Sequence, residues 1–159
     1  MKNSRFTVAT HILSILSFYY EMKPGFLVKS HWMADSVNTN PVIIRRILGK
    51  LREAGLVDIQ GGASGGAKLT RSPKKISLKH VYKAIEDDKL FALHTNTPSV
   101  DCPVGLTIRP VISGVFDEVD NAVNSVLEEK SLDDLYQEMQ TNYTEKYSRT
   151  FKELFKMES

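Results

Sequence analysis

The chain has 159 residues, of which 42% are hydrophobic and 25% are charged, so it is long enough for one globular domain with an appendage. No apolar run approaches the roughly 20 residues of a membrane-spanning helix, and a single cysteine excludes an intramolecular disulfide framework. Residues 1–100 carry 15 Lys and Arg against 7 Asp and Glu, whereas residues 101–159 carry 6 against 12. This division favours contact of the first part alone with a polyanion, although two separately solvated surfaces would give the same pattern.

The first segment is predicted to be an amphipathic helix. Its apolar residues follow helical spacing, polar residues interrupt them, and no cleavage site of small residues follows. We therefore expect a cytoplasmic protein that begins with a structural helix and not with a signal peptide. Lys2, Ser4 and Arg5 lie at the start of this helix and are candidates for contact with a phosphate.

Residues 30–37 are predicted to form a short helix, with Trp32, Met33 and Val37 facing inward. Lys29 and Ser30 precede it, where a helix N-terminus would point toward a phosphate. Residues 38–40 are predicted to be a tight turn into the next helix, which gives the spacing of a helix-turn-helix.

The second helix of this pair is basic and carries clear end signals. Asn40 can cap it, Pro41 suits its first position, and Gly55 suits a left-handed end. At 100° per residue two faces separate. The predicted core face holds Ile44, Ile47, Leu48 and Leu51, and the opposite face holds Val42, Arg45, Arg46 and Gly49. A face with two arginines beside small residues can lie close against DNA.

A β-hairpin is predicted next, with strands at residues 56–60 and 68–70 and the six-residue tip GGASGG. The backbone N–H groups of the tip and Ser64 would approach phosphates, with Lys68 behind them. A plain surface loop is the alternative. A nucleotide-binding loop is disfavoured because the Lys-Ser/Thr pair of a P-loop is absent. The fold class is therefore mostly α with a small β-hairpin, a winged helix-turn-helix domain over residues 1–88.

The remainder of the chain is predicted to hold a dimerisation helix. Ser77 caps a helix that ends near residues 87–88, and residues 89–103 form a linker that contains the single cysteine. Residues 104–139 are then predicted to hold a long helix with an apolar stripe. Pro110 must either kink this helix or mark its start. A second copy of the chain would cover this stripe; packing on its own domain is the alternative. The expected dimerisation residues are Ile108, Val111, Ile112, Val115, Phe116, Val119, Val123 and Val126. A short helix over residues 132–139 would continue this unit, and residues 140–159 are a tail that could dock as a helix.

The order of these features resembles the Rrf-two family of bacterial winged-helix transcription regulators. The resemblance covers roughly residues 1–135, through RRILGKLREAGLV, the Gly-Gly-x-x-Gly-Gly tip, ISLKHVYKAIE and CPVG before the long helix. It implies a homodimeric repressor on a pseudo-palindromic double-stranded DNA operator, with Asn40, Val42 and Arg45 at base edges and residues 64–66 at the wing contact. The full set of candidate DNA-binding residues is Lys2, Ser4, Arg5, Lys29, Ser30, Asn40, Pro41, Val42, Arg45, Arg46, Lys50, Ser64, Gly65, Gly66 and Lys68.

The chain departs from that family in its cysteines. Cluster-binding members carry three between the wing and the long helix, and here only Cys102 is present. One thiolate per subunit cannot hold an ordinary iron–sulfur cluster, so we expect no cluster, metal or other cofactor, as in the cluster-less, YwnA-like branch. Cys102 is either a redox switch, because a helix N-terminus favours thiolate, or a buried remnant of the lost site. A small-molecule effector is left open.

Two other classes of function were weighed. A winged-helix domain can serve as a protein-interaction module that does not read DNA, although such a module needs no outward arginine pair. A thiol enzyme has less support, because Cys102 has His94 nearby in sequence but no third orienting residue.

Overall fold

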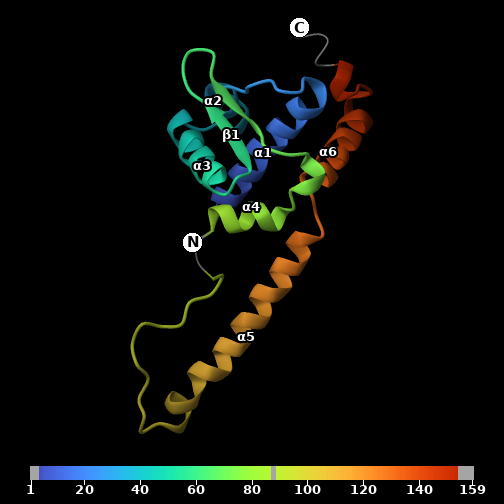
Figure 1. Cartoon of the computed structure of the whole chain (residues 1–159). Helices are drawn as coiled ribbons and strands as arrows, with labels where there is room; N and C mark the ends of the chain where they lie inside the picture. Colours follow the sequence, from blue (N-terminus) through green and yellow to red (C-terminus); the bar gives the residue numbers. More distant parts are fainter. Residues whose placement is uncertain (1–3, 87–88, 154–159) are drawn as a thin grey trace.

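The computed structural model describes residues 4–86 and 89–153, and it shows a winged domain from which one long helix projects (Figure 1). Lys2 and the expected helix end at residues 87–88 lie outside the described residues. The helices are α1 (Arg5–Met22), α2 (Ser30–Val37), α3 (Pro41–Glu53), α4 (Leu78–Ile85), α5 (Pro103–Glu128) and α6 (Leu132–Tyr147). The strands are β1 (Val57–Gln60) and β2 (Gly66–Leu69), followed by a 3-10 turn, η1 (Pro73–Lys75). The predicted fold class is confirmed.

The turn between α2 and α3 is closed by a left-handed residue. Asn38 has φ 58°, a conformation that asparagine tolerates better than most residues, and its N–H donates to the carbonyl of Asp35 at 3.2 Å. The N–H of Thr39 donates to the carbonyl of Ala34 at 2.9 Å. These bonds end α2 and redirect the chain into α3 as the sequence predicted.

The core of the domain forms around α1. The four apolar residues predicted on the inner face of α3 are at most 4% exposed, and they pack with buried residues of α1, α2, α4 and the hairpin. Met33 of α2 is fully buried, but Trp32 is 43% exposed, so its predicted inward position is wrong. Its ring instead stacks at the surface on Phe26, with centroids 6.1 Å apart.

The hairpin is antiparallel, with Val57 opposite Leu69 and Gln60 opposite Gly66. The return strand begins two residues earlier than predicted. The cause lies outside the hairpin, because the backbone N–H and carbonyl of Ala67 exchange hydrogen bonds of 2.9 Å with those of Val28. This bridge extends the ladder and fixes the hairpin against the segment that leads into α2.

The long helix α5 leaves the domain and has no buried residue among those described. The helix begins at Pro103 and continues through Pro110, so Pro110 does not mark its start. Pro110 cannot donate a backbone hydrogen bond within the helix. Of the predicted dimerisation residues, Val111, Val115 and Val126 are 65%, 47% and 63% exposed. Ile108 is also exposed, and Ile112, Phe116, Val119 and Val123 are partly buried.

The linker before α5 packs on one side of that helix. Phe91 stacks on Phe116, with centroids 5.1 Å apart. Lys89 forms an ion pair with Asp117. The side-chain hydrogen bond to this carboxylate, together with its negative charge, raises the pKa of Lys89. Phe116 is therefore partly covered by its own chain. Its assignment to the dimer face stays a prediction.

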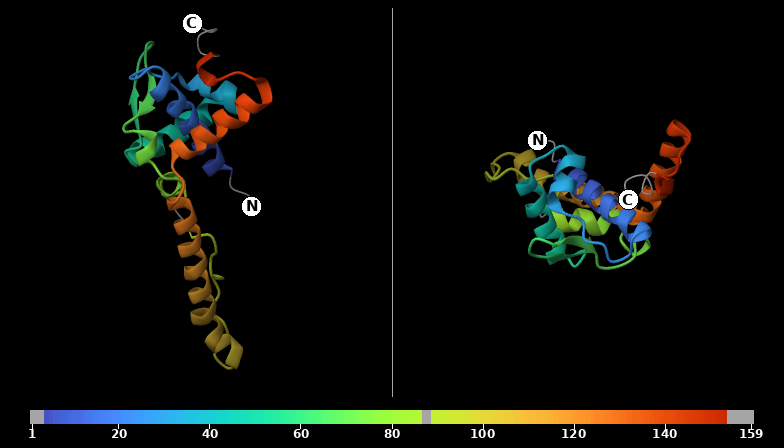
Figure 2. Two further views of the ribbon diagram at one scale, coloured as in Figure 1. Left: turned by 90° about the vertical axis from the view of Figure 1, so that its right-hand side faces the viewer. Right: turned by 90° about the horizontal axis from the view of Figure 1, so that it is seen from above.

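The helix α6 returns to the winged domain instead of continuing the α5 unit. It extends to Tyr147, past the predicted end at residue 139, and it lies along α1 (Figure 2). Leu132 and Tyr136 are 0% and 4% exposed. Two bonds join its start to the start of α4: Leu78 N–H donates to the Lys130 carbonyl at 2.8 Å, and Leu132 N–H donates to the Ile76 carbonyl at 2.9 Å. The first turns of α6 thus pack on the winged domain through Leu132 and Tyr136. In the part of the chain described here, no helix combines the length and apolarity that a membrane crossing requires.

Candidate nucleic-acid interface

The outer face of α3 is basic, and a side-chain cap fixes its start. Oδ1 of Asn40 accepts a hydrogen bond from the N–H of Val42 at 2.8 Å, with Pro41 in the first helical position. Such a cap contributes about 1 kcal/mol to stability. Val42 is 54% exposed, and Arg45 and Arg46 are exposed beside it. The face predicted to meet DNA therefore lies at the surface.

A groove of about 490 Å³ lies between α3, the N-terminus of α2 and the hairpin. Its polar walls come from both helices and from the end of β1, and they include Lys29, Ser30, Arg45, Arg52 and Gln60. Glycines of the hairpin tip, Gly65 and Gly66 among them, form the remaining side. Five predicted residues that are distant in sequence are thus brought to one groove: Lys29, Ser30, Arg45, Gly65 and Gly66.

The N-terminus of α2 opens into this groove. Lys29 is its N-cap residue, and Ser30 and His31 are its first two helical residues; all three line the groove. The first backbone N–H groups of a helix have no partner within it, and they carry a partial positive charge. Together with Lys29 they form a local site that suits a phosphate oxygen.

The two glycines at the start of the returning strand are needed for close packing. A Cβ at Gly66 would lie 2.6 Å from the carbonyl oxygen of Val28, and one at Gly65 would lie 2.2 Å from that of Gln60. Real Cβ atoms essentially never show contacts this short. Gly65 and Gly66 therefore hold the hairpin closed, in addition to lining the groove.

Several predicted residues lie elsewhere. Lys50 is on the flank of α3 that faces α4, and its Nζ donates to the carbonyl of Ile85 at 3.4 Å. Arg5 forms an ion pair with Glu86 at 3.2 Å, beside α4. Ser4, at the start of α1, and Ser64, at the hairpin tip, are exposed and do not line the groove. Arg46 is exposed on the outer face of α3 and does not line it either.

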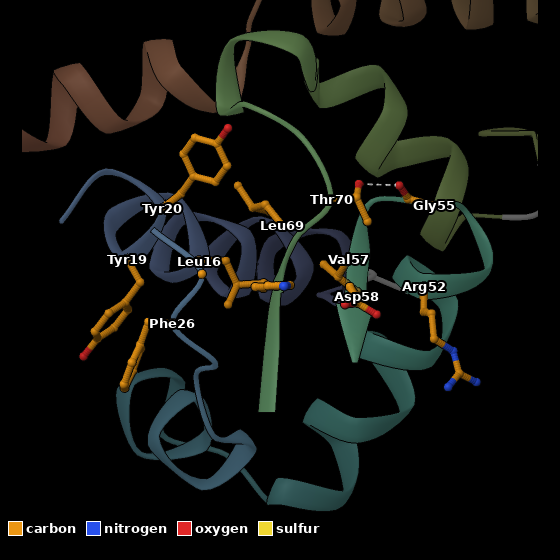
Figure 3. Close-up of a pocket in the computed structure, with 12 residues that line it drawn as sticks. Leu16, Tyr19, Tyr20, Phe26, Arg52, Gly55, Val57, Asp58, Leu69 and Thr70 are labelled. Atoms are coloured by element: carbon orange, nitrogen blue, oxygen red, sulfur yellow. Dashed lines mark hydrogen bonds between the residues drawn. The ribbon is translucent and has the colours of Figure 1, made fainter. Parts of the chain in front are cut away.

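Lys68 does not line the groove. It is paired across the ladder with Asp58, and both residues line a second pocket of about 580 Å³ between the hairpin and the end of α1. Figure 3 shows this pocket, with Tyr19, Tyr20 and Phe26 on the side of α1. Because side chains alternate along a strand, Lys68 shares a face of the hairpin with Gly66, which does line the groove, but it lies two residues farther from the hairpin tip.

Three polar groove residues were not anticipated from the sequence: His31, Arg52 and Gln60. Arg52 had a detectable signal, because it follows Arg45 by seven residues, or about two helical turns, and so shares its side of the helix. Arg52 lines both the groove and the pocket of Figure 3. Nothing in the sequence alone placed His31 or Gln60, because their positions depend on how α2 and β1 approach α3.

A winged helix-turn-helix with a basic groove between its second helix and its wing is the architecture of a transcription regulator. The comparisons with known proteins agree. Residues 2–138 match the model of the Rrf2 family, described as iron-dependent transcriptional regulators. YwnA of Bacillus subtilis (strain 168), named as a candidate HTH-type transcriptional regulator, is 40% identical over 136 residues, 85% of this chain and 96% of its own length.

Solved structures give the same result. A crystal structure of a candidate DNA-binding protein is 36% identical, with a TM-score of 0.63, and covers 83% of this chain and 98% of its own. A candidate transcriptional regulator from Lactobacillus plantarum has a TM-score of 0.74 at 22% identity, over 89% of this chain and 93% of its own. The chain belongs to the Rrf2 family of transcriptional regulators.

The residues of this chain do not fit the iron centre that the family description implies. An iron–sulfur cluster is held by about four ligands, most of them cysteine thiolates. The sequence has one cysteine, Cys102, which is exposed at the N-cap of α5. Within residues 4–86 and 89–153, no three His, Cys, Asp or Glu side chains gather where they could hold a metal ion.

Proposed function

We propose that the protein is a sequence-specific DNA-binding regulator that acts as a homodimeric repressor. In this proposal α3 enters the major groove, and the hairpin wing follows the adjacent minor groove. The observation that carries it is the groove that joins Arg45 and Arg52 of α3, the N-terminus of α2 and the glycine tip of the wing. Cationic side chains and free N–H groups from three elements meet there, as phosphate contact requires.

The proposal assigns Asn40, Val42 and Arg45 to base edges. All three lie at the first turns of α3 and are exposed. Arg46 and Lys29 would contact phosphates on either side of the DNA groove that α3 enters. These roles differ in their effects, because base contacts set the preferred sequence and phosphate contacts set overall affinity.

The dimer in this proposal forms through α5. Its open stripe comprises Val104, Ile108, Val111, Val115, Val119, Ala122 and Val126, which lie within about 40° of one line at 100° per residue. A helix this apolar that projects from its domain is stabilised when a second copy covers it. Two-fold symmetry then places two α3 helices on half-sites of a pseudo-palindrome, spaced by one helical turn of DNA or a small multiple.

Cys102 is the proposed redox switch within this dimer. Its thiol is exposed at the N-cap of α5, next to the linker that packs on that helix. In the proposed step the thiolate attacks a low-molecular-weight disulfide, forms a mixed disulfide and releases one thiolate. The added group would change how the linker and α5 meet, and hence the spacing of the two α3 helices.

The test is a titration of the full chain on the DNA just upstream of its own coding region and on a scrambled duplex, at two salt concentrations. Salt-sensitive preference for the upstream DNA, with a log–log slope of about −0.9 per phosphate contact, supports the proposal. Equal and salt-insensitive affinity for the two duplexes, together with no enriched site in a random-sequence selection, would favour a protein-interaction module. Repeating the titration with oxidised wild type and with Cys102→Ser tests the switch, since only the wild type should respond to oxidation.

A further inference from the structure

A pocket of about 1010 Å³ lies between α1, α2 and α6, on a different side of the domain from the proposed DNA groove. In the left view of Figure 2, α6 lies alongside α1. The helix α1 also contacts α2, so the three helices that supply the walls are neighbours through α1. Its wall is rich in aromatic side chains: Phe18, Tyr19, Phe26, Trp32, Tyr136 and Phe151. The volume is at the upper end of the range typical of small-molecule sites.

The aromatic side chains form two sets that meet at Phe18 and Tyr19, whose ring centroids are 5.3 Å apart in edge-to-face geometry. On one side Tyr19 stacks on Phe26 with centroids 5.0 Å apart, and Phe26 stacks on Trp32 at 6.1 Å. On the other side the ring of Phe151 meets Phe18 at 5.7 Å and Tyr136 at 5.8 Å, in edge-to-face geometry. Two sets of aromatic rings around one hollow favour a flat, apolar ring system.

The polar groups of the pocket favour an anion on that ring system. Nζ of Lys23 lies 4.6 Å from the ring centroid of Phe26, and among the described residues it has no carboxylate partner. The hydroxyl of Tyr136 is buried without a hydrogen-bond partner, and burial raises the pKa of Tyr136, so the group remains a donor. His11 hydrogen-bonds Ser36 at 3.1 Å on the same wall, and Asp35 is the one carboxylate in the lining.

We propose that this pocket binds a planar aromatic carboxylate, with the ring between the two aromatic sets and the carboxylate beside Lys23. Part of the pocket belongs to the C-terminal segment of this chain, because the family match ends at residue 138 and both Met139 and Phe151 line the wall. Met139 and Phe151 are therefore lining residues that the family match does not cover.

Occupancy would act on the DNA groove through α2. This short helix carries Trp32 and Asp35 on the wall of the pocket, while its first residues, Ser30 and His31, line the DNA groove. A ligand that shifts α2 would move its N-terminus relative to α3. This second part of the proposal rests on the proposed DNA-binding function, whereas the ligand site itself does not.

Trp32 provides a direct signal, because it is the only tryptophan. Its indole N–H gives one cross-peak in an ¹⁵N–¹H correlation spectrum of the full chain. We expect 2-naphthoate to shift this peak with saturation, and the neutral 2-naphthamide to bind on the order of tenfold more weakly, since it lacks the charge that Lys23 would meet. Lys23→Met should reduce the affinity for 2-naphthoate by a similar factor.

A matched control is Lys146→Met. Lys146 also lies over an aromatic ring, 5.1 Å from the centroid of Tyr147, but it does not line the pocket. Its substitution should leave 2-naphthoate binding unchanged. The ligand site is overturned if 2-naphthoate does not move the Trp32 peak at millimolar concentration, if the amide binds equally well, or if the two lysine variants lose affinity equally.

The coupling to DNA is tested separately. 2-Naphthoate should change the affinity of the wild type for its operator, and Lys23→Met should need on the order of tenfold more ligand for the same change. Binding at Trp32 without any change in DNA affinity would overturn the coupling and leave the site intact. A chain that binds 2-naphthoate and no DNA at all would overturn the proposed function and the coupling and leave the ligand site intact.

Discussion

The ring of Phe91 stacks on the ring of Phe116, with their centroids 5.1 Å apart and their planes 28° from parallel. This contact places the linker on one side of α5. Nearby, the N–H of Leu90 donates to the carboxylate of Asp120 at 3.3 Å on the same side. The linker thereby leaves a separate apolar stripe uncovered, with Val111 and Val115 near its centre. The chain supplies a cover for one face of α5, and the second copy in the proposed dimer would cover the other.

Replacing Val115 by glutamate should prevent dimerisation. A carboxylate at the centre of an apolar helix pair is desolvated without a partner, which should weaken the dimer by about 100-fold or more. Analytical ultracentrifugation of the full chain over a concentration series measures this directly. The matched control is Asn121→Glu, which adds the same charge at an exposed position on another side of α5. Equal effects of the two substitutions would mean that the stripe is not the interface.

Replacing Arg45 by alanine should lower affinity for the preferred DNA site by about 1–3 kcal/mol and relax the preference at one base position. The reason is that Arg45 is exposed and lines the groove, where the proposal has it contact a base edge. Fluorescence anisotropy on the preferred site and on single-base variants gives both quantities. Arg109→Ala removes the same charge from α5 and should leave the base preference unchanged. An Arg45→Ala variant that binds every duplex like the wild type would contradict the assigned faces of α3.

Replacing Gly66 by alanine should displace the wing. The added Cβ would lie 2.6 Å from the Val28 carbonyl oxygen, so either the bridge to Val28 or the ladder must open. We expect a loss of about 1–3 kcal/mol in stability, typical of forced overpacking, together with weaker DNA binding. Urea unfolding and anisotropy measure the two effects. Gly61→Ala is the control, because a Cβ there meets nothing within 4 Å, and it should change neither quantity appreciably.

Replacing Asp134 by asparagine should destabilise the protein in a pH-dependent way. The N–H and Oγ of Ser131 both donate to Oδ2 of Asp134 at 2.7 Å, and these bonds lower the pKa of that carboxyl. Because the folded-state pKa is lowered, the stabilisation is fully present above the ordinary aspartate range, near pH 4, and is lost as the pH falls through the lower folded value. The wild type should therefore be more stable than Asp134→Asn at pH 7, and the difference should shrink below about pH 4.

Thermal unfolding at pH 7, 4 and 3 tests this expectation. Asp133→Asn is the matched control, since Asp133 lies in the same first turn of α6 and receives no hydrogen bond from Ser131. A stability difference that grows on acidification, or one that is equal in the two variants, would mean that the cap at Ser131 is not its source.

Local chemistry made much of the winged domain predictable. The cap at Asn40, the proline at the next position and the helical period of α3 each depend on residues within one or two turns. The glycine-rich tip likewise predicted a hairpin without any knowledge of its neighbours. The expected inner face of α3 is confirmed for the same reason, because a face is a property of the helix itself.

Contacts between distant segments decided the rest. The bridge from Ala67 to Val28 joins β2 to the segment before α2, and Lys68 lines the pocket beside the end of α1 instead of the groove. Arg52 entered the groove and Lys50 turned to the Ile85 carbonyl because α3 lies between the hairpin and α4. Periodicity assigns a residue to a side of a helix but cannot say what approaches that side.

The sequence by itself thus determined the helix-turn-helix, the wing and the absence of a cysteine ligand set for a cluster, since each rests on composition or on spacing along one segment. Only the tertiary structure decided that α6 returns to the domain, that Phe91 covers Phe116, and that α1, α2 and α6 enclose an aromatic pocket. The physical reason is that burial is shared between segments: an apolar side chain gains the same free energy against any surface that removes it from water. Its partner is therefore chosen by the packing of the whole chain.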